Sequence, residues 1–174
     1  GPMSRRIDVA PLPALLALAL FTLAAPARAS HGPATFSIVA YDSVTQELGV
    51  AVESKYFSVG RTVPWAEAGV GAVATQANVN ASYGPKALAM LRAGMRPDEI
   101  LRAFAASDSQ WNSRQVGIVD ARGRVATWTG ERCNSWAGGE AGASFACQGN
   151  ILAGPAVVDS MAAAYQSAAG SLAD

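Results

Sequence analysis

TFSIVAYD (residues 35–42) and ELGVAVES (residues 47–54) are two runs that read as β-strands. The first is rich in Thr, Ile, Val and aromatic residues, which favour strands, and the second carries Val50 and Val52. The short polar segment 43–46 separates them, so we expect an antiparallel hairpin. Such a hairpin brings Thr35, at the start of the first strand, close to Lys55, at the end of the second. The chain is therefore expected to build a sheet around this hairpin.

Further strands and helices follow the hairpin in a mixed order. Strands grouped by hairpins around a helix pair indicate the α+β class, with antiparallel sheet packed against helices, and not a doubly wound βαβ array. Extended segments are predicted at residues 70–76, 114–120, 124–129 and 144–148, the last of them reached through the glycine-rich stretch 138–142. Helices are predicted after Ser82 as far as Arg92, from Pro97 to Ala106, and from Ala156 to Ala168.

The first residues have the three parts of a secretory signal peptide. Gly1-Pro2 ahead of Met3 is interpreted as a cloning scar. Residues 3–29 contain an arginine pair, an apolar run and a small-residue cleavage site, and the apolar run falls short of the roughly 20 residues that a membrane span needs. We therefore expect an exported protein, periplasmic or secreted, that has no membrane attachment after cleavage. Residues 30–34 then remain as a linker or propeptide.

Composition limits the partners of the exported part. Residues 30–174 suit about one domain and carry ten basic against twelve acidic side chains, a net charge of about −2. The basic residues are scattered, which argues against a nucleic-acid partner. Cys133 and Cys147 are predicted to form a disulfide because an exported protein folds in an oxidising compartment, and two buried thiols are the alternative.

Several common catalytic and binding motifs are absent from the sequence. The single histidine, His31, lies ahead of the first strand, so we expect no Ser-His-Asp triad within the fold, no Cys-His pair and no histidine-based metal site. The sequence contains neither a phosphate-binding loop nor a dinucleotide-binding glycine motif. We therefore expect no metal and no organic cofactor.

The remaining candidate for nucleophilic chemistry is the hydroxyl of Thr35. Side chains alternate along a strand, so Thr35 shares a face with Ser37, and Lys55 shares a face with Glu53. A threonine with a free α-amine carries its own general base, because that amine has an unperturbed pKa of about 7.7–8.0. A nearby Lys55 ammonium lowers the pKa of the amine further. The alternative is that Thr35 is only a strand-forming residue and Lys55 only a solvated one.

Eight motifs, taken in their order along the chain, resemble one bacterial family. They are TFSIVA at residues 35–40, LGVAV at 48–52, VPWA at 63–66, GVGAVATQ at 69–76, SYGP at 82–85, RQVGIVD at 114–120, WAG at 136–138 and QGNILAG at 148–154. On these motifs the chain closely resembles the domain of unknown function 1028 family, which is grouped with the N-terminal nucleophile (Ntn) hydrolases. The resemblance implies, for residues 35–174, a four-layer αββα sandwich of two antiparallel sheets flanked by helices.

By analogy with that superfamily, the resemblance implies hydrolysis of amide bonds by an N-terminal threonine. Thr35 is then the nucleophile and Lys55 the residue that tunes its amine. Asn78 and Asn150 are expected to donate hydrogen bonds to an oxyanion, as is Gln76, although binding of loop backbone is the alternative for each amide. Substrate contacts are expected from Gln76, Ser37, Glu53 and Trp65.

Three departures from the family pattern bear on this expectation. Glu53 stands where a small residue is expected, and it is placed to pair with Lys55 or Arg61. Residues 30–34 separate signal cleavage from Thr35, so a free Thr35 amine requires a second cut, autocatalytic or otherwise. The chain stops before the last strand of the family pattern, so part of the sheet is expected to be absent or supplied by another polypeptide.

Together with the signal-peptide pattern, the resemblance thus implies an exported amide hydrolase that acts on a small amide, a peptide or a peptidoglycan fragment. The alternative is a non-catalytic module of the same fold that binds the cell wall or another ligand. In that case sugars would stack on some of the four tryptophans, Trp65, Trp111, Trp128 and Trp136, although packing in the core is the alternative that we favour for most of them. A third interpretation is a structural subunit that completes its sheet with a partner, either a second copy or its own C-terminal fragment.

Overall fold

The predicted hairpin forms at the start of the described chain. The computed structural model describes residues 34–174, so the cloning scar, the signal peptide and residues 30–33 of the linker lie outside the described residues. Strand β1 (Thr35–Tyr41) pairs antiparallel with β2 (Leu48–Ser54), and on its other side with β8 (Phe145–Asn150). Strand β1 is therefore held between two neighbours along most of its length.

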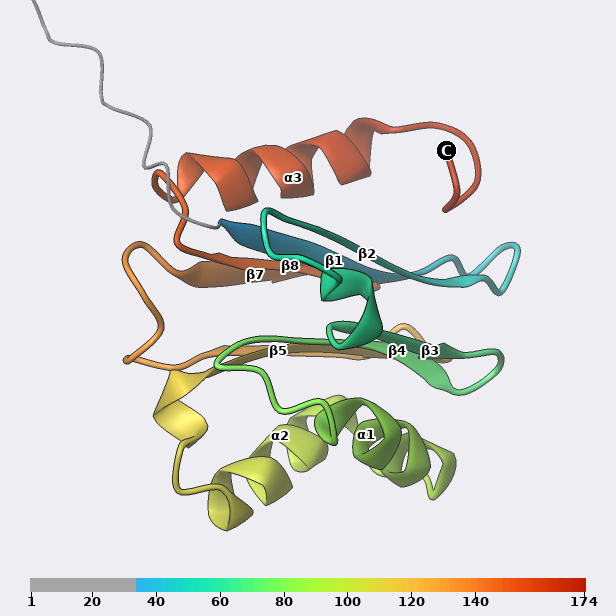
Figure 1. Ribbon diagram of the computed structural model, residues 1–174. Coiled ribbons are helices and arrows are strands. Elements are labelled where there is room, and N and C mark those ends of the chain that lie inside the picture. Colours follow the sequence, from blue (N-terminus) through green and yellow to red (C-terminus); the bar gives the residue numbers. More distant parts are fainter. Residues whose placement is uncertain (1–33) are drawn as a thin grey trace, which may run out of the picture.

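Eight strands of residues 34–174 form two antiparallel sheets of four strands each. The first sheet has the order β2-β1-β8-β7, and the second has the order β3-β4-β5-β6. The sheets lie face to face (Figure 1). This arrangement confirms the α+β class with antiparallel pairing. The remaining strands are β3 (Pro64–Glu67), β4 (Gly71–Ala77), β5 (Arg114–Asp120), β6 (Val125–Thr129) and β7 (Gly138–Gly142).

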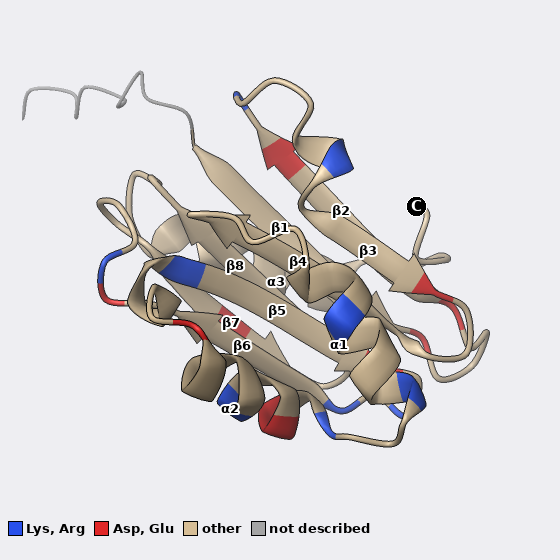
Figure 2. Ribbon diagram, turned by 60° about the horizontal axis from the view of Figure 1, so that its bottom comes forward, with Lys and Arg blue, Asp and Glu red and all other residues tan. Residues whose placement is uncertain are grey.

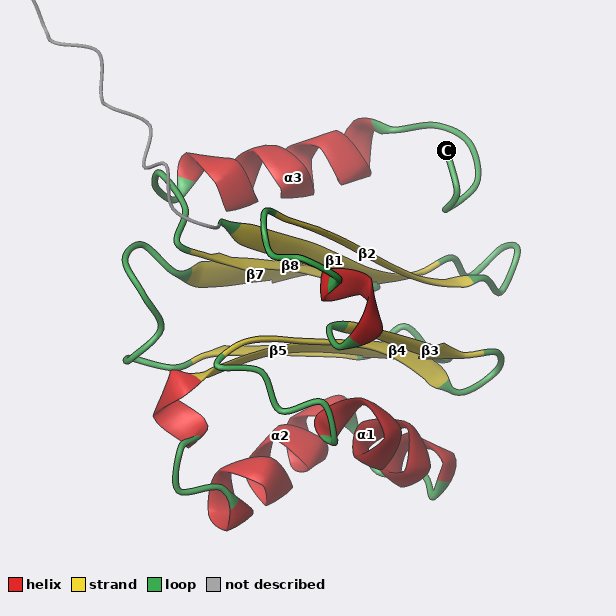
Figure 3. Cartoon of the chain, in the orientation of Figure 1, coloured by secondary structure: helices red, strands yellow, loops and turns green. Residues whose placement is uncertain are grey.

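Helices lie on the outer face of each sheet. Helices α1 (Tyr83–Arg92) and α2 (Pro97–Ser107) pack against the second sheet, and α3 (Ala156–Ser167) packs against the first (Figure 3). Helix α2 begins with Pro97, and the carboxylate of Glu99 accepts the backbone N–H of Arg96 at 2.7 Å. Two 3-10 turns, η1 (Val59–Arg61) and η2 (Trp111–Ser113), connect elements. The three predicted helices are confirmed, with small shifts at their ends.

The layers are packed with side chains of different size. Small side chains fill the space between the sheets, namely Val39, Val63, Ala72, Ala74, Val119 and Ala146. Larger ones, including Leu88, Ile100 and Phe104, fill the space under α1 and α2. Small inter-sheet side chains let the two sheets approach closely, which brings the polar residues at one end of the sheets into contact across the gap.

Two edge strands, β3 and β7, were not predicted. Strand β3 begins with Pro64, which cannot donate a hydrogen bond and is therefore confined to the start or edge of a sheet. Strand β7 reads GGEAG, and glycine is depleted in strands because it has no side chain to pack. Both strands are held by pairing with a longer neighbour, β4 or β8, and not by their own propensity.

Charged residues lie mainly on the helices, the loops and the ends of strands (Figure 2). The faces of the sheets that meet each other are built from apolar and neutral polar side chains. Within residues 34–174, no helix combines the length and the hydropathy needed to cross a membrane.

Candidate functional site

A cavity of about 430 Å³ opens at the end of the sheets where β1 begins and where β4 and β8 end. Four of the predicted site residues line it: Thr35, Gln76, Asn78 and Asn150. They come from three strands and the loop after β4, and the pairing of β1 with β8 sets Thr35 directly opposite Asn150. The structure therefore brings together half of the side chains that were expected to form the site.

The hydroxyl of Thr35 lies beside the hydroxyl of Ser54. Thr35 is 5% exposed, and its Oγ1 is 2.9 Å from Ser54 Oγ. Ser54 Oγ also accepts the backbone N–H of Tyr56 at 3.0 Å. The two hydroxyls meet because Thr35 and Ser54 are directly opposite each other in the β1–β2 pair, and opposite residues share a face of the sheet. Ser54 was not among the predicted site residues.

The structure does not bring Lys55 or Glu53 into the site. Both are exposed and neither lines the cavity. The hairpin ends do meet, since the backbone N–H of Lys55 donates to the carbonyl of Ala34 at 3.4 Å. The pleat, however, turns Ser54 toward Thr35 and the residues on either side of Ser54 the other way. The expected approach of the two strand ends is therefore confirmed, but the side chain that reaches Thr35 is that of Ser54 and not that of Lys55.

Three buried side-chain amides, those of Gln76, Gln115 and Asn150, are joined by hydrogen bonds between the sheets. Buried Gln148 joins them through its backbone carbonyl, which accepts from Gln76 Nε2, and we call these four residues the carboxamide cluster. Gln115, on β5, is its centre. Its Oε1 accepts hydrogen bonds from Gln76 Nε2 at 2.8 Å and from Asn150 Nδ2 at 3.0 Å. Its Nε2 donates to Gly149 O at 2.8 Å, Thr129 Oγ1 at 2.9 Å and Gly138 O at 3.1 Å.

Gln148 extends the carboxamide cluster under β1. Its Nε2 donates to Ser37 Oγ at 2.7 Å, and its Oε1 accepts from Thr127 Oγ1 at 3.3 Å. Gly117 on the facing sheet makes room for this amide, because a Cβ at that position would lie 2.2 Å from Gln148 Oε1. Ser37 is thus buried beneath the site as a partner of Gln148, and it does not line the cavity as a substrate contact.

Gln76 leaves one buried acceptor without a partner. It is 1% exposed and lines the cavity, and its Oε1 has no hydrogen bond within residues 34–174. Its Nε2 donates to Gln115 Oε1 at 2.8 Å and to the carbonyl of Gln148 at 3.3 Å, which fixes the orientation of the amide. A buried acceptor without a donor costs about 1–3 kcal/mol. Gln76 therefore carries a fully buried side-chain oxygen that no donor of residues 34–174 satisfies.

The backbone is strained at two positions that line the cavity. Ala77 has a φ of 65° at the end of β4, and Ile151 has a φ of 57° directly after β8. A left-handed conformation is costly for a residue with a Cβ, and most of all for a β-branched one. Such strain persists where the surrounding structure imposes it, and it concentrates at functional sites.

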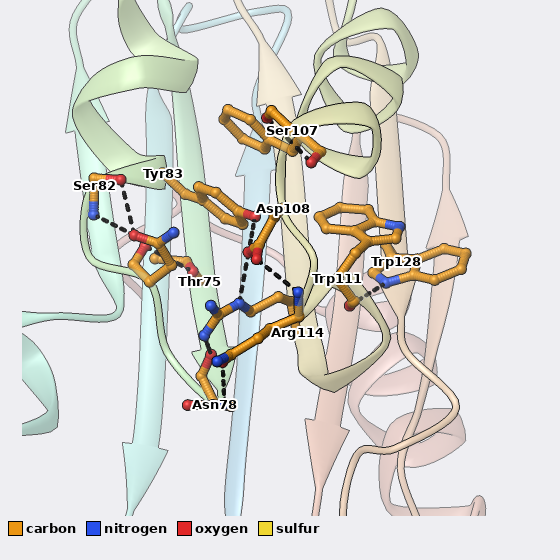
Figure 4. Close-up of polar contacts among 12 residues, drawn as sticks. Thr75, Asn78, Ser82, Tyr83, Ser107, Asp108, Trp111, Arg114 and Trp128 are labelled. Carbon is orange, nitrogen blue, oxygen red and sulfur yellow. Dashed lines mark hydrogen bonds and ion pairs between the residues drawn. The ribbon is translucent and has the colours of Figure 1, made fainter.

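An ion pair holds the loop of Asn78 in place. The guanidinium of Arg114 donates to Asp108 Oδ2 from Nε at 2.8 Å and to the backbone carbonyl of Asn78 from a terminal nitrogen (Figure 4). Asp108 Oδ2 also accepts from the hydroxyl of Tyr83 at 2.5 Å. The side chains of Arg114 and Asp108 are 10% and 13% exposed. The Arg114 guanidinium, together with the Tyr83 hydroxyl, holds the pKa of the Asp108 carboxyl well below its usual range.

Asp108→Asn is expected to lower the free energy of unfolding at pH 7 by about 2 kcal/mol, because it removes the charge from a largely buried pair. The pKa of Asp108 is depressed in the folded state, so the carboxylate stabilises the fold above its unfolded pKa of about 3.8 and that contribution is lost as the pH falls through the folded value. Urea unfolding at pH 7 and at pH 3 measures this. The exposed Asp159→Asn serves as control, and an Asp108→Asn deficit that stays equal at both pH values would contradict the assignment.

The predicted disulfide is not formed, and both cysteines are free thiols. Cys147 is buried on the α3 face of the first sheet, whereas Cys133 lies at the cavity, where its Sγ donates to the carbonyl of Arg114 at 3.4 Å. Burial raises the pKa of Cys133, and burial together with Glu140 raises the pKa of Cys147 to about 12. The raised pKa keeps the Cys133 thiol protonated at neutral pH, and a protonated thiol is a weak nucleophile.

The tryptophans do not form a surface for sugar stacking. Trp65 packs on α1, since a Cβ at Gly84 would lie 2.1 Å from its ring, and its Nε1 donates to Thr62 O at 3.0 Å. Trp65 therefore does not contact the cavity, contrary to expectation. Trp111 and Trp128 stack on each other with ring centroids 5.1 Å apart (Figure 4). Trp136 packs against the cluster beneath α3.

Comparison with known proteins places the chain in a family. The model of a family of unknown function, the domain of unknown function 1028 family, matches residues 35–174. The chain belongs to this family. A crystal structure of a protein from Silicibacter pomeroyi, described as carrying the same family domain, is similar with a TM-score of 0.77 at 28% identity. The similarity covers 80% of the chain described here and 65% of the length of the Silicibacter protein. No functionally curated protein matches the chain.

Proposed function

We propose that this protein is an N-terminal nucleophile hydrolase that cleaves amide bonds with Thr35. The proposal is carried by the position of Thr35, which begins β1, lies between two neighbouring strands and lines the cavity together with Gln76, Asn78 and Asn150. Two facing antiparallel sheets with helices outside them are consistent with the four-layer sandwich of that superfamily (Figure 1). The family's own description gives no activity, so the argument depends on the site.

The described residues that line the cavity support this mechanism because they offer no side-chain base to activate Thr35. Among the described residues that line it, none carries a carboxylate, an imidazole or an amine. The partner of Thr35 Oγ1 is another hydroxyl, Ser54 Oγ, which is too weak a base to activate it. Once the Ala34–Thr35 bond is cut, the free α-amine of Thr35 itself can act as the base that takes the proton of the Thr35 hydroxyl. If Thr35 stayed inside the chain, its hydroxyl would have no carboxylate, imidazole or amine to act as a base among the described residues that line the cavity.

In the proposed reaction, the free Thr35 amine takes the hydroxyl proton while Oγ1 attacks the carbonyl carbon of the amide. In this proposal the side-chain NH2 groups of Asn150 and Asn78, which line the cavity, stabilise the resulting oxyanion. Each uses the N–H that remains after its hydrogen bond to Gln115 Oε1 or Gln110 Oε1. Collapse of the intermediate breaks the C–N bond, and the amine returns the proton to the leaving nitrogen. Water then hydrolyses the ester on Thr35, which restores the hydroxyl and releases the acid.

The first test is whether the Ala34–Thr35 bond is cut. Intact mass and N-terminal sequencing of the purified, exported chain are expected to give Thr35 as the first residue, because the mechanism requires its free amine. Turnover with an amide is then expected to leave a hydroxylamine-sensitive ester on the Thr35 peptide, detectable by mass spectrometry. A chain that hydrolyses amides while Ala34 remains attached would exclude the free-amine mechanism.

Export to the periplasm or the medium is part of the same proposal, since the signal-peptide pattern of residues 3–29 precedes the site. The substrates that fit such a location are small amides, peptides and peptidoglycan fragments. A non-catalytic module that binds sugars through tryptophan finds no support in the site, because the described tryptophans pack against other parts of the fold.

A further inference from the structure

The cavity has a single formal charge on its wall. Among the described residues that line it, Arg132 is the one that is charged, and no acidic residue is among them. Arg132 is exposed, and its side chain makes no ion pair with a carboxylate of residues 34–174. A guanidinium presents a planar fork of donors that matches a carboxylate. Arg132 therefore offers the cavity a group that can bind an anion such as a carboxylate.

Gln76 provides a second point of recognition. Its buried Oε1 is an acceptor without a donor, and the orientation of its amide is fixed by two hydrogen bonds from Nε2. An acceptor in this state is satisfied by an N–H of a bound molecule. The N–H of an amide substrate, whose carbonyl must lie near Thr35, is such a donor.

Apolar side chains form the rim of the cavity. Phe57 is 98% exposed, Tyr56 is 60% exposed and Val79 is 39% exposed, and all three line the cavity. They account for three of the four large hydrophobic side chains that are exposed in residues 34–174. Exposed apolar groups gathered at one opening indicate that an apolar group covers them when the cavity is occupied.

We propose that the substrates are N-acylated amino acids or short peptides that have a free carboxylate and an apolar side chain. Arg132 binds the carboxylate, Gln76 accepts the amide N–H, and Tyr56 and Phe57 cover the apolar side chain. The amide cleaved is the one whose nitrogen belongs to this carboxylate-bearing residue. This inference rests on the proposed hydrolase function for the reaction, but its binding part is independent of turnover. The cavity of about 430 Å³ is within the range of small-molecule sites.

Two probes of nearly equal size separate the carboxylate from the rest of the ligand. N-acetyl-L-phenylalanine and N-acetyl-L-phenylalaninamide are titrated into the full chain and into its Thr35→Ala variant, which removes turnover from the measurement. We expect the acid to bind about tenfold more tightly than the amide, a preference that Arg132→Gln abolishes. Arg122→Gln is the matched control, because Arg122 is also exposed and makes no ion pair within residues 34–174 but lies in the turn at the far end of β5.

Equal binding of acid and amide, an acid preference that survives Arg132→Gln, or failure of both probes to bind would overturn the inference. Circular dichroism of each variant establishes that it is folded. These experiments distinguish a failure of the ligand-class inference from a failure of the proposed hydrolase function. Loss of acid preference in a chain that hydrolyses amides removes the inference and leaves the hydrolase. Acid binding that depends on Arg132, in a chain that hydrolyses no amide, supports the inference on ligand class and removes the hydrolase.

Discussion

Thr35→Ala is expected to lower the turnover of an N-acyl amino acid by about a thousandfold or more, equivalent to about 4 kcal/mol of transition-state stabilisation. The variant removes the oxygen that forms the ester but leaves the cavity wall otherwise intact. Thr35→Ser keeps a hydroxyl at the same place and is expected to retain turnover within about tenfold of the original chain. Release of the amino acid from N-acetyl-L-phenylalanine, followed by chromatography, measures both.

Ser37→Ala provides the matched control for this experiment. Ser37 is a buried hydroxyl on the same face of β1, two residues further along, and it does not line the cavity. Its loss is expected to remove the hydrogen bond that Gln148 Nε2 donates to Ser37 Oγ but to leave the Thr35 hydroxyl in place. If Thr35→Ala and Ser37→Ala reduce turnover equally, the effect of Thr35 is structural and the proposed nucleophile is wrong.

Gln115→Leu is expected to lower the free energy of unfolding by about 4 kcal/mol, which would be the largest stability effect of a single side chain in the site. Leucine is close to glutamine in size, so the change leaves little empty space. It removes all five hydrogen bonds of the Gln115 amide and leaves the carbonyls of Gly138 and Gly149 and the Nδ2 of Asn150 without this partner in the interior. Urea unfolding monitored by tryptophan fluorescence measures the change.

Gln166→Leu is the control for Gln115→Leu. It makes the same substitution at an exposed position on α3 and is expected to change the free energy of unfolding by less than about 0.5 kcal/mol. A deficit below about 1 kcal/mol for Gln115→Leu would mean that water or a rearranged amide satisfies the cluster, and that the cluster does not hold the cavity wall in place.

The hydrophobic pattern of the sequence predicted the elements of the fold well where a strand or helix has its own propensity. The hairpin, β4, β5, β6, β8 and the three helices follow from β-branched runs, apolar periodicity and capping residues. The edge strands β3 and β7 do not, because their proline and glycines disfavour a strand that exists only through pairing with a neighbour. Pairing of distant strands into two sheets is a tertiary property that no local pattern contains.

The site was predicted unevenly for a related reason. Thr35 and Asn150 meet through the β1–β8 register, and the resemblance of separate motifs to one family identified both without that register. Lys55 was misplaced because a shift of one residue reverses the face of a strand. Gln115 and Gln148 were missed, although each is a polar residue inside an otherwise apolar strand. That pattern is a usable signal, since a buried amide must find partners in the interior.

The place of β1 in its sheet has a consequence for the cut that the mechanism needs. A new chain end in most proteins frays, because it loses the covalent bond that restrained it on one side. Here the end created at Thr35 would still be clamped laterally by Ser54 on one flank and Asn150 on the other. Cleavage would then convert the backbone nitrogen of Thr35 from an amide to an amine while leaving its position in the sheet nearly unchanged. The nascent and the matured protein would share one architecture, and activation would need no folding step after the bond breaks.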